Sequence, residues 1–574
     1  MYLGSLVDVG KPGEAEDSGL APSGDRLRVS WRWGAVAVGL AVLLYAGWRA
    51  FWFLTDDAYI TFRYISNHLA ARGYVWNLPP FRPVEGYTSF LWMVLLERIW
   101  RVFGIPPPQS ANTVSLVFAY GTLAVLIVTG LRMNLTGGGR RDRLVLVTLA
   151  LLGTLTNRTF LAWTSSGLET AMLNFFITLW LFLTLFPGRR PGWWTFSITL
   201  AASLVYLTRP DGMLFVLGTA AVLAMGLARG QVKLRHLLYA LPGLLVPAHL
   251  IWRKSYYGQW LPNTYYAKLV GVWPESGIRY GLCFAMEYSL WIWGSLFAIW
   301  LWKASRRRRA TKTDRAADPV SSSPTLLIAL GVLLAHAAYY TLVVGGDHFE
   351  YRVYSHLVPL MFVSAVWLAD RVFSRRWAVC GSVALAVVLS WPVPWLHWGA
   401  THNLQTRAET RRLIHPVAPS FSQPFRAYVG LFDRMQRWLI VHSVCRRHQE
   451  HKVFHLHQCE VYPARGRGAE IPWEGRPVYA VRTVGVPGWV MPNVAIIDLF
   501  GLNDYVIARN RVTGEGGDRV MAHDRSPPPG YVECFDPNVE LGRPGTVAVR
   551  ERARPLEDRD IVRCEEGWWA WAER

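Results

Sequence analysis

Two adjacent carboxylates, Asp56 and Asp57, are the residues best suited to chemistry, and they directly follow the first long apolar run of the chain. Arg63, Glu85 and Tyr87 lie in the same polar segment. Ionisable groups at a bilayer boundary are costly and usually functional, and a Lys or Arg anchor is the more usual residue at a helix end. The pair is therefore a candidate for general base catalysis, with an ordinary water-exposed helix end as the alternative.

Further acids and bases occur in four polar motifs between later apolar runs: SGLE (166–169), RPDG (209–212), NTYYAK (263–268) and GGDHFEYR (345–352). Each has an ordinary alternative: a turn for RPDG, an interfacial Tyr/Lys anchor for NTYYAK, and packing for the histidine. If they gather at one interface with the acid pair, they build a cavity that contains carboxylates and cations. The candidate substrate-binding residues are Arg63, Glu85, Tyr87, Glu169, Arg209, Asp211, Asn263, Tyr266, Lys268, Asp347, His348 and Arg352.

Membrane helices are the elements that must position these motifs. Of the 574 residues, 52% are hydrophobic and only 17% are charged, whereas soluble domains have roughly 25% charged residues. The predicted fold is mainly α, a polytopic membrane protein with about eleven transmembrane helices. The apolar runs that predict them are 34–54, 114–130, 144–160, 168–186, 194–207, 213–227, 237–252, 281–302, 325–344, 353–368 and 377–395.

The segment 91–103 decides the topology, because it is apolar but contains Glu97, Arg98 and Arg101. If it lies flat as an amphipathic helix in the outer interface, the Arg-rich loops all face the cytoplasm, as the positive-inside rule requires. If it spans the membrane, they all face outward. We adopt the first arrangement, with a cytoplasmic N-terminus. It also accounts for the net charge of +20 without nucleic acid, because the arginines lie in short loops.

This topology predicts three parts of the chain: a disordered cytoplasmic tail (1–32), a transmembrane domain (33–396) and an extracytoplasmic C-terminal domain (397–574). The first external loop of the transmembrane domain is 55–108. The C-terminal part contains strand-like runs such as VAIIDLF (494–500). We therefore expect an α/β or mostly β domain there.

Four cysteines lie in the C-terminal part, which the topology places in an oxidising compartment. An even number predicts two disulfides, and three pairings are open, with a slight preference for Cys445–Cys459. Cys534 and Cys564 complete the set. The sequence has no CxxC pair, so zinc has little support.

The predicted cavity suits a substrate with an anionic head and a long apolar tail, because cations bind phosphate while a lipid enters between helices. A polyprenyl-phosphate sugar has this form, and its leaving group is already a phosphate. A positioned base and cations can then suffice for transfer. The sequence contains neither a GxGxxG motif nor a P-loop. We expect no cofactor besides the lipid-linked donor, assign no metal ligands, and leave a divalent metal open.

Four motifs carry a resemblance to a known family: DDAYITFR (56–63), VEGYT (84–88), SGLE (166–169) and RPDG (209–212). They resemble the terminal arabinofuranosyltransferases of mycobacterial walls and their bacterial relatives, within the glycosyltransferase C superfamily of polyprenyl-phosphate-sugar enzymes. The resemblance covers the membrane part, about two thirds of the chain, and extends more loosely to DLFGLND (498–504).

The resemblance implies an acceptor-activating carboxylate at Asp56 or Asp57 and a donor phosphate held by basic residues. Lys268, His348 and Arg352 are our choices for the phosphate, from position alone. The C-terminal part offers side chains that suit a neutral polyol acceptor through hydrogen bonds and ring stacking. These are Asp498, Asn503, Asp504, Trp473 and Trp489.

The predicted activity is transfer of a sugar, with arabinofuranose one candidate, to an envelope glycan or glycolipid on the outer face of the bacterial plasma membrane. The expected partners are the lipid-linked donor, the acceptor and membrane lipids, without nucleic acid. A flippase of lipid-linked sugars and a non-catalytic envelope-assembly protein are the alternatives. A transporter predicts inverted repeats with broken helices, and the sequence shows no such paired segments.

Overall fold

The computed structural model describes residues 31–136, 139–310, 324–410, 414–510 and 519–572. Almost all of the predicted tail 1–32 lies outside these ranges. The helices of the membrane part are α1 (Trp31–Ala50), α2 (Asp56–Leu69), α3 (Phe90–Phe103), α4 (Pro107–Arg132), α5 (Arg140–Leu155), α6 (Arg158–Trp163), α7 (Thr170–Leu185), α8 (Pro191–Thr208), α9 (Met213–Ala228), α10 (Leu245–Tyr257), α11 (Asn263–Lys268), α12 (Pro274–Glu287), α13 (Trp291–Ala310), α14 (Pro324–Ala338), α15 (Leu357–Val372), α16 (Arg376–Leu389) and α17 (Pro392–Thr401).

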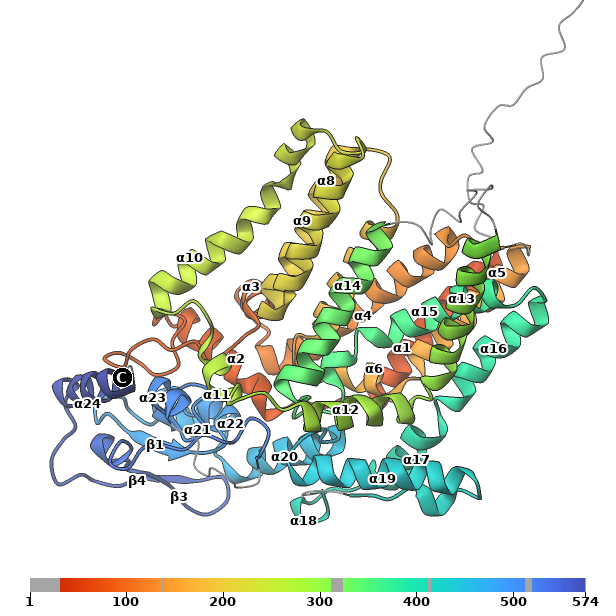
Figure 1. Ribbon diagram of the computed structural model, residues 1–574. Coiled ribbons are helices and arrows are strands. Elements are labelled where there is room, and N and C mark those ends of the chain that lie inside the picture. The colour runs from red at the N-terminus through yellow and green to blue at the C-terminus, as the bar shows by residue number, and fades with distance from the viewer. Residues whose placement is uncertain (1–30, 137–138, 311–323, 411–413, 511–518, 573–574) are drawn as a thin grey trace, which may run out of the picture.

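The C-terminal part follows α17 and lies along one side of the membrane helices (Figure 1). Its elements are α18 (Arg407–Thr410), α19 (Phe425–Val441), α20 (His448–Val461), α21 (Arg465–Ala469), β1 (Val478–Val481), α22 (Gly485–Val490), β2 (Ala495–Asp498), α23 (Tyr505–Arg509), β3 (Val539–Leu541), β4 (Val547–Val549) and α24 (Asp558–Ala572).

All the predicted apolar runs are helical over most of their length. In the described part of the chain, seven helical segments are long and apolar enough to cross a membrane, and the pair α12–α13, bent by 91°, makes an eighth if it is one span. The predicted number of about eleven is higher because α5 and α7 have 16 residues each and α8 has 18, whereas a span needs about 20. The predicted span 281–302 is bent, because the chain turns near Ser289, where φ is 51°.

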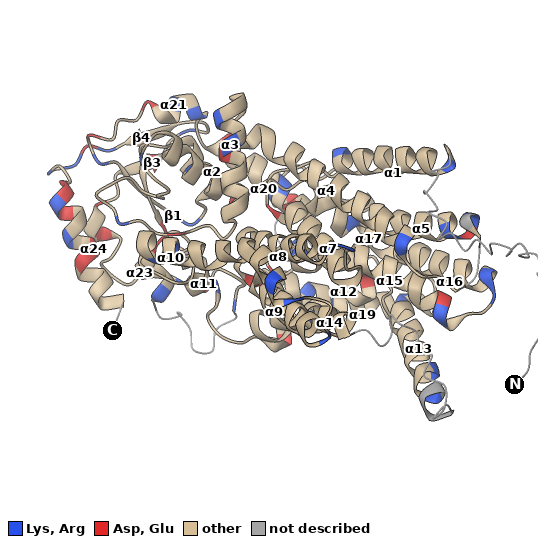
Figure 2. Ribbon diagram, turned by 90° about the horizontal axis from the view of Figure 1, so that it is seen from above, with Lys and Arg blue, Asp and Glu red and all other residues tan. Residues whose placement is uncertain are grey.

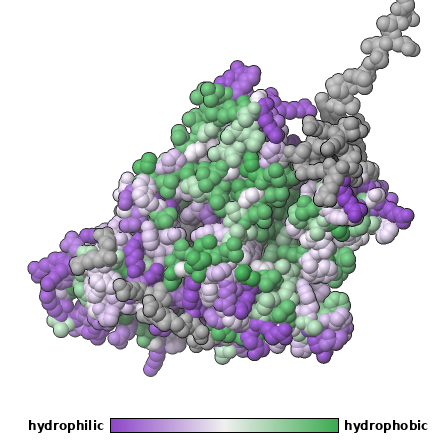
Figure 3. All heavy atoms as spheres, in the orientation of Figure 1, coloured by the Kyte–Doolittle hydropathy of each residue, from purple (hydrophilic) through white to green (hydrophobic). Residues whose placement is uncertain are grey.

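The surface of the protein matches a multi-pass membrane protein. Hydrophobic side chains gather over the helices in the upper part of the molecule, and hydrophilic ones gather over the C-terminal part (Figure 3). Lys and Arg residues mark the ends of α5, α13 and α16 (Figure 2). α3 forms a helix over the segment 91–103, as predicted. Its position in the outer interface, like the orientation of the chain in the membrane, stays a prediction.

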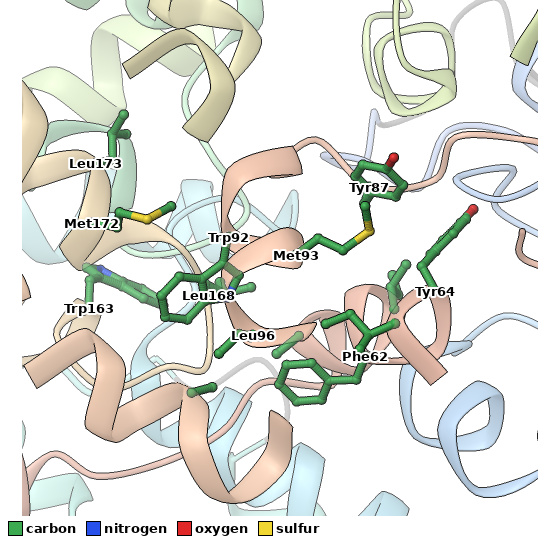
Figure 4. Close-up of a cluster of buried hydrophobic side chains, with 14 of the residues drawn as sticks. Phe62, Tyr64, Tyr87, Trp92, Met93, Leu96, Trp163, Leu168, Met172 and Leu173 are labelled. Carbon is green, nitrogen blue, oxygen red and sulfur yellow. The ribbon is translucent and has the colours of Figure 1, made fainter. Parts of the chain in front are cut away.

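α2 lies between the membrane helices and the C-terminal part. The hydroxyl of Thr55 caps its start by accepting a hydrogen bond from the backbone N–H of Ala58 (3.3 Å). Phe62 lies in one buried cluster with Trp92 and Leu96 of α3 (Figure 4). α22 and α20 of the C-terminal part also pack against α2, and the ring of Phe62 lies 6.1 Å from that of Trp489 in α22. Most residues of α2 are therefore buried, which fixes the acid pair at its start.

The C-terminal part is mainly helical, so of the two predicted classes, α/β or mostly β, the mostly β class was wrong. The parallel strands β1 and β2, with α22 between them in the chain, are an α/β arrangement. Only two small sheets form in its described residues: β1 and β2 pair in parallel, and β3 and β4 pair antiparallel. The run 494–500 supplies a strand of four residues, Ala495–Asp498. The helices α19 and α20 also contact the membrane part, α19 against α12 and α20 against α2. The strand-like run correctly predicted a strand, but one short strand does not make the domain a mostly β one.

One disulfide joins Cys534 to Cys564, with 6.1 Å between their Cα atoms. The preferred pair Cys445–Cys459 was wrong, and both thiols are free. Cys445 precedes α20 and Cys459 lies near its end, so the helix separates them by about 16 Å at 1.5 Å per residue. A disulfide needs Cα atoms within about 7 Å.

Four fully buried charged side chains join the membrane part to the C-terminal part: Arg158, Glu287, Glu350 and Arg447. Arg447 donates to both oxygens of Glu287, at 2.9 and 3.0 Å. Glu350 accepts from Arg447 and from Arg158. Glu350 belongs to the GGDHFEYR motif, so this cluster holds that loop against the start of α20. Removing one member leaves a buried charge without its partner.

We predict that Arg447→Leu destabilises the protein by about 3–5 kcal/mol, because Glu287 and Glu350 lose their shared guanidinium. Thermal unfolding of the full chain in detergent measures this. Arg437→Leu is the matched control, because Arg437 is exposed on the neighbouring helix α19. Equal melting temperatures for the two variants would contradict the role of the cluster.

Candidate functional site

Two cavities meet at the start of α2. Cavity A has a volume of about 220 Å³, and most of its lining comes from the membrane part, including Tyr87, Glu169, Arg209, Asp211, Lys268, Tyr340, Asp347 and Arg352. Cavity B has a volume of about 350 Å³, and most of its lining comes from the C-terminal part, including Arg407, Arg446, Glu450, His451, Arg482 and His523. Asp57 and Lys268 line both cavities.

Asp56 and Asp57 point to different surroundings. Both carboxylate oxygens of Asp56 accept backbone hydrogen bonds from α22, from Gly485 at 3.0 Å and from Val486 at 2.8 Å. Burial raises the pKa of Asp56 to about 7. Asp57 is half-exposed, and its carboxylate makes no hydrogen bond or ion pair with the residues that the structure describes. Asp57 is therefore the acid available to a substrate, and Asp56 is a positioning residue.

Lys268 faces Asp57 from the other side of the junction, at the end of α11. α11 is fixed at its start by Asn263, whose amide donates to the backbone oxygens of Gly501 (2.8 Å) and Asp504 (2.9 Å). Lys268 itself is half-buried and has no hydrogen bond or ion pair within the described ranges. Its ammonium group is free to bind an anion.

Four predicted substrate-binding residues line neither cavity: Arg63, Glu85, Asn263 and Tyr266. Arg63 donates to backbone oxygens of the C-terminal part, at 2.7 Å for Gly488 and 2.8 Å for Val494. Glu85 forms a buried ion pair with Arg253 (2.7 Å). Tyr266 lies against the guanidinium of Arg509. These contacts hold α2, α10 and α11 in place, and a substrate-binding role for the four residues stays a prediction.

The predicted charged residues of cavity A are paired with one another. Arg209 bonds Glu169 at 3.0 Å and Asp211 at 3.2 Å, and Arg352 bonds Asp347 at 2.9 Å. The sequence motifs SGLE, RPDG and GGDHFEYR thus meet in one wall, as predicted. His348, from the last of these motifs, lines cavity B instead.

The predicted acceptor residues of the C-terminal part, Asp498, Asn503, Asp504, Trp473 and Trp489, line neither cavity. Asp498 is fully buried and accepts from the backbone N–H groups of Phe500 (3.0 Å) and Asn503 (2.9 Å). Asp504 caps α23 by accepting from the backbone of Ile507 (2.9 Å). The DLFGLND motif therefore builds its own turn, and its Phe500 and Leu502 line cavity B. The acceptor role of the five predicted residues stays a prediction.

Sequence reasoning missed the basic lining of cavity B. The segment 442–452, HSVCRRHQEHK, supplies Arg446, Glu450 and His451. Its dense mixture of His and Arg before a helix was the available signal. It matched no motif, and its partners Arg482 and His523 come from separate loops. Among the described residues, no group of three or more His, Cys, Asp or Glu side chains is arranged to hold a metal ion.

The chain has a mainly helical membrane fold with an acid pair at the start of α2. Its fold is similar to that of ArnT from Cupriavidus metallidurans, in a structure bound to undecaprenyl phosphate, with a TM-score of 0.50 and 12% sequence identity. The match covers 81% of this chain and 86% of that one. It confirms a mainly helical, ArnT-like membrane fold.

Two curated relatives are more specific. The chain is 27% identical over 374 residues to the terminal beta-(1->2)-arabinofuranosyltransferase of Corynebacterium glutamicum, covering 60% of this chain and 52% of that protein. It is 28% identical over 384 residues to the enzyme of the same name from Mycobacterium tuberculosis, covering 60% and 58%. The chain thus spans little more than half the length of the curated relatives it matches. No family model matches it. The resemblance seen in the motifs is confirmed as a distant one.

We predict that Asp56→Asn increases hydrogen exchange at the backbone amides of Gly485 and Val486. An amide side chain offers one acceptor oxygen where the carboxylate offers two, and a hydrogen bond to a charged group contributes about 1.5–3 kcal/mol. Exchange measured by mass spectrometry on the full chain should rise roughly tenfold or more at this segment. Asp57→Asn is the matched control and should exchange as the wild type does. The same exchange rate in both variants would show that Asp56 does not hold α22.

Proposed function

We propose that the chain is a membrane glycosyltransferase that transfers a sugar from a polyprenyl-phosphate donor to an envelope glycan or glycolipid. One observation carries the proposal: a single carboxylate, Asp57, and a single ammonium group, Lys268, line both cavities. A transferase needs one base and one cation within reach of two substrates at once. The names of the curated relatives favour arabinofuranose as the sugar.

The donor suits cavity A. Leucine and tyrosine side chains of the membrane part, such as Leu168, Leu261 and Tyr339, contribute to its lining, so a prenyl chain can leave between the helices toward lipid. Lys268 supplies the unpaired cation for the donor phosphate. The acceptor then enters from cavity B and meets the sugar at Asp57.

The proposed reaction is a direct displacement. The acceptor hydroxyl oxygen forms a bond to the anomeric carbon while the bond between that carbon and the phosphate oxygen breaks. Asp57 takes the hydroxyl proton, and the polyprenyl phosphate leaves with the electron pair and its negative charge beside Lys268. Asp56 contributes by holding the start of α2 against α22. The ion pairs of cavity A hold the side chains of its wall in place.

The proposed orientation places both cavities and residues 397–574 outside the plasma membrane and the N-terminus inside. The Lys and Arg residues at the ends of α5, α13 and α16 support it, because basic loops favour the cytoplasm (Figure 2). The proposed division into a membrane domain (33–396) and a C-terminal domain (397–574) describes only where each part lies relative to the membrane. Leu502, Met521 and Ala522 of the C-terminal part line cavity A, so that cavity is incomplete without them.

We predict that Asp57→Asn lowers the rate of sugar transfer by about 10²–10⁴-fold, the usual contribution of a general base. The assay follows transfer from a polyprenyl-phosphate sugar to an envelope glycan acceptor, using the full chain in lipid. Glu470→Gln, an exposed carboxylate at the end of α21, is the control and should retain wild-type activity. A flippase or an assembly protein would keep its function in Asp57→Asn, and that result would reject the proposed chemistry.

We predict that a reporter fused after Arg574 is active when it is one that works only outside the plasma membrane. A fusion at the same position to a reporter that works only in the cytoplasm should be inactive. The physical reason is the charge of the loops on the opposite side. The reverse pattern would place both cavities in the cytoplasm and would contradict the orientation.

A further inference from the structure

Cavity B differs from cavity A in its balance of charge. In cavity A each arginine has its own carboxylate. In cavity B the cations Arg407, Arg446, Arg482 and Lys268 outnumber the acids Asp56, Asp57 and Glu450. Glu450 lies 2.6 Å from Arg407 and 3.6 Å from Arg446. Arg482 is exposed and has no partner among the residues described here. Asp56 binds backbone amides, and Asp57 is the proposed base, so neither acid neutralises Arg482.

Three histidines complete the wall of cavity B. The ring of His348 lies 5.2 Å from that of His451 and 5.1 Å from that of His523. Burial and the guanidinium of Arg446 hold the pKa of His348 well below its usual range, and burial lowers that of His523. Both rings are therefore neutral at pH 7, so the arginines are the cations of this wall.

The tautomers of these histidines follow from their partners. Nδ1 of His348 donates to the backbone oxygen of Ser443 (2.8 Å), and Nδ1 of His523 donates to that of Met521 (2.6 Å). The Nε2 atom of each neutral ring then carries a lone pair that accepts from a hydroxyl group. Nε2 of His451 is fully buried, so this atom is not offered to a ligand. Cavity B thus combines excess cations with the acceptor nitrogens of His348 and His523.

We propose that cavity B binds an acceptor that carries a negative charge, with a phosphate or carboxylate group at the arginines and sugar hydroxyls at the histidines. This inference rests on the proposed function, because it names the class of acceptor for that reaction. It replaces the neutral polyol expected from the sequence. Arginines with a shortage of carboxylates bind phosphate and carboxylate groups through charge-assisted hydrogen bonds. Arg407, Arg446 and Arg482 line cavity B only, whereas Lys268, which serves the donor phosphate, lines both cavities.

Binding of inorganic phosphate to the full chain in zwitterionic nanodiscs, measured by calorimetry, tests this site. Wild-type protein should bind phosphate, and Arg482→Gln should weaken binding about tenfold, since one charge-assisted contact is lost. Because Arg482 is exposed, this variant is expected to fold. Arg467→Gln, an exposed arginine of α21 that lines neither cavity, is the matched control. Equal affinities for the two variants, or no binding to the wild type, would overturn the proposal.

A second arm separates the acceptor anion from the donor phosphate. Phosphate binding is repeated with saturating polyprenyl phosphate in the nanodisc, and its affinity should change less than about twofold. If the lipid phosphate displaces inorganic phosphate competitively, cavity B is the donor site and the assignment to the acceptor fails. The measurement needs no turnover, so a failure of Asp57→Asn to lower transfer would reject the proposed chemistry without changing this result.

Discussion

The contact between α2 and α22 determines how the catalytic end of the protein is built. Asp56 and Arg63 are seven residues apart, so they project from the same face of α2. Asp56 accepts from the backbone amides of α22, and Arg63 donates to the carbonyl oxygen of Gly488 in the same helix. The approach is so close that a Cβ atom on Gly485 would lie 1.9 Å from the backbone oxygen of Asp56. One face of α2 is therefore covered by α22. Asp57 lies on the adjacent face and lines the two cavities.

This contact also explains which parts of the site could be predicted from the sequence. The acid pair, the apolar runs and the motifs of cavity A have side-chain signatures, and they were found. The partners of Asp56 are backbone amides more than 400 residues later in the chain. Every residue type except proline has a backbone amide, so the sequence does not show which amides a carboxylate will bind. The two acids were therefore indistinguishable until the fold was known. Likewise, the basic residues of cavity B come from separate segments, so no local pattern joins them.

Buried charge in this protein has two uses that look alike in a sequence. Glu85 was a candidate ligand, but it pairs with Arg253 inside the fold, and burial raises its pKa to about 7. The cluster around Arg447 ties the GGDHFEYR loop to α20. Buried ion pairs contribute little net stability compared with apolar packing, but a missing partner is costly, so they specify one arrangement. In a membrane protein the same residue types serve structure and catalysis. The two roles are distinguished by whether the side chain has a partner inside the fold and whether it is exposed to a cavity.

The unequal charge of the two cavities bears on turnover. A transferase must release its polyprenyl phosphate after each reaction, and a phosphate held by several unpaired arginines would leave slowly. In cavity A, Arg209 and Arg352 already bind carboxylates, so Lys268 is the one described cation there without such a partner. In the proposed reaction, a single ammonium group would stabilise the leaving phosphate and still allow it to depart. The arginine excess lies instead in cavity B, where tighter binding would orient the proposed acceptor before its hydroxyl group reaches Asp57.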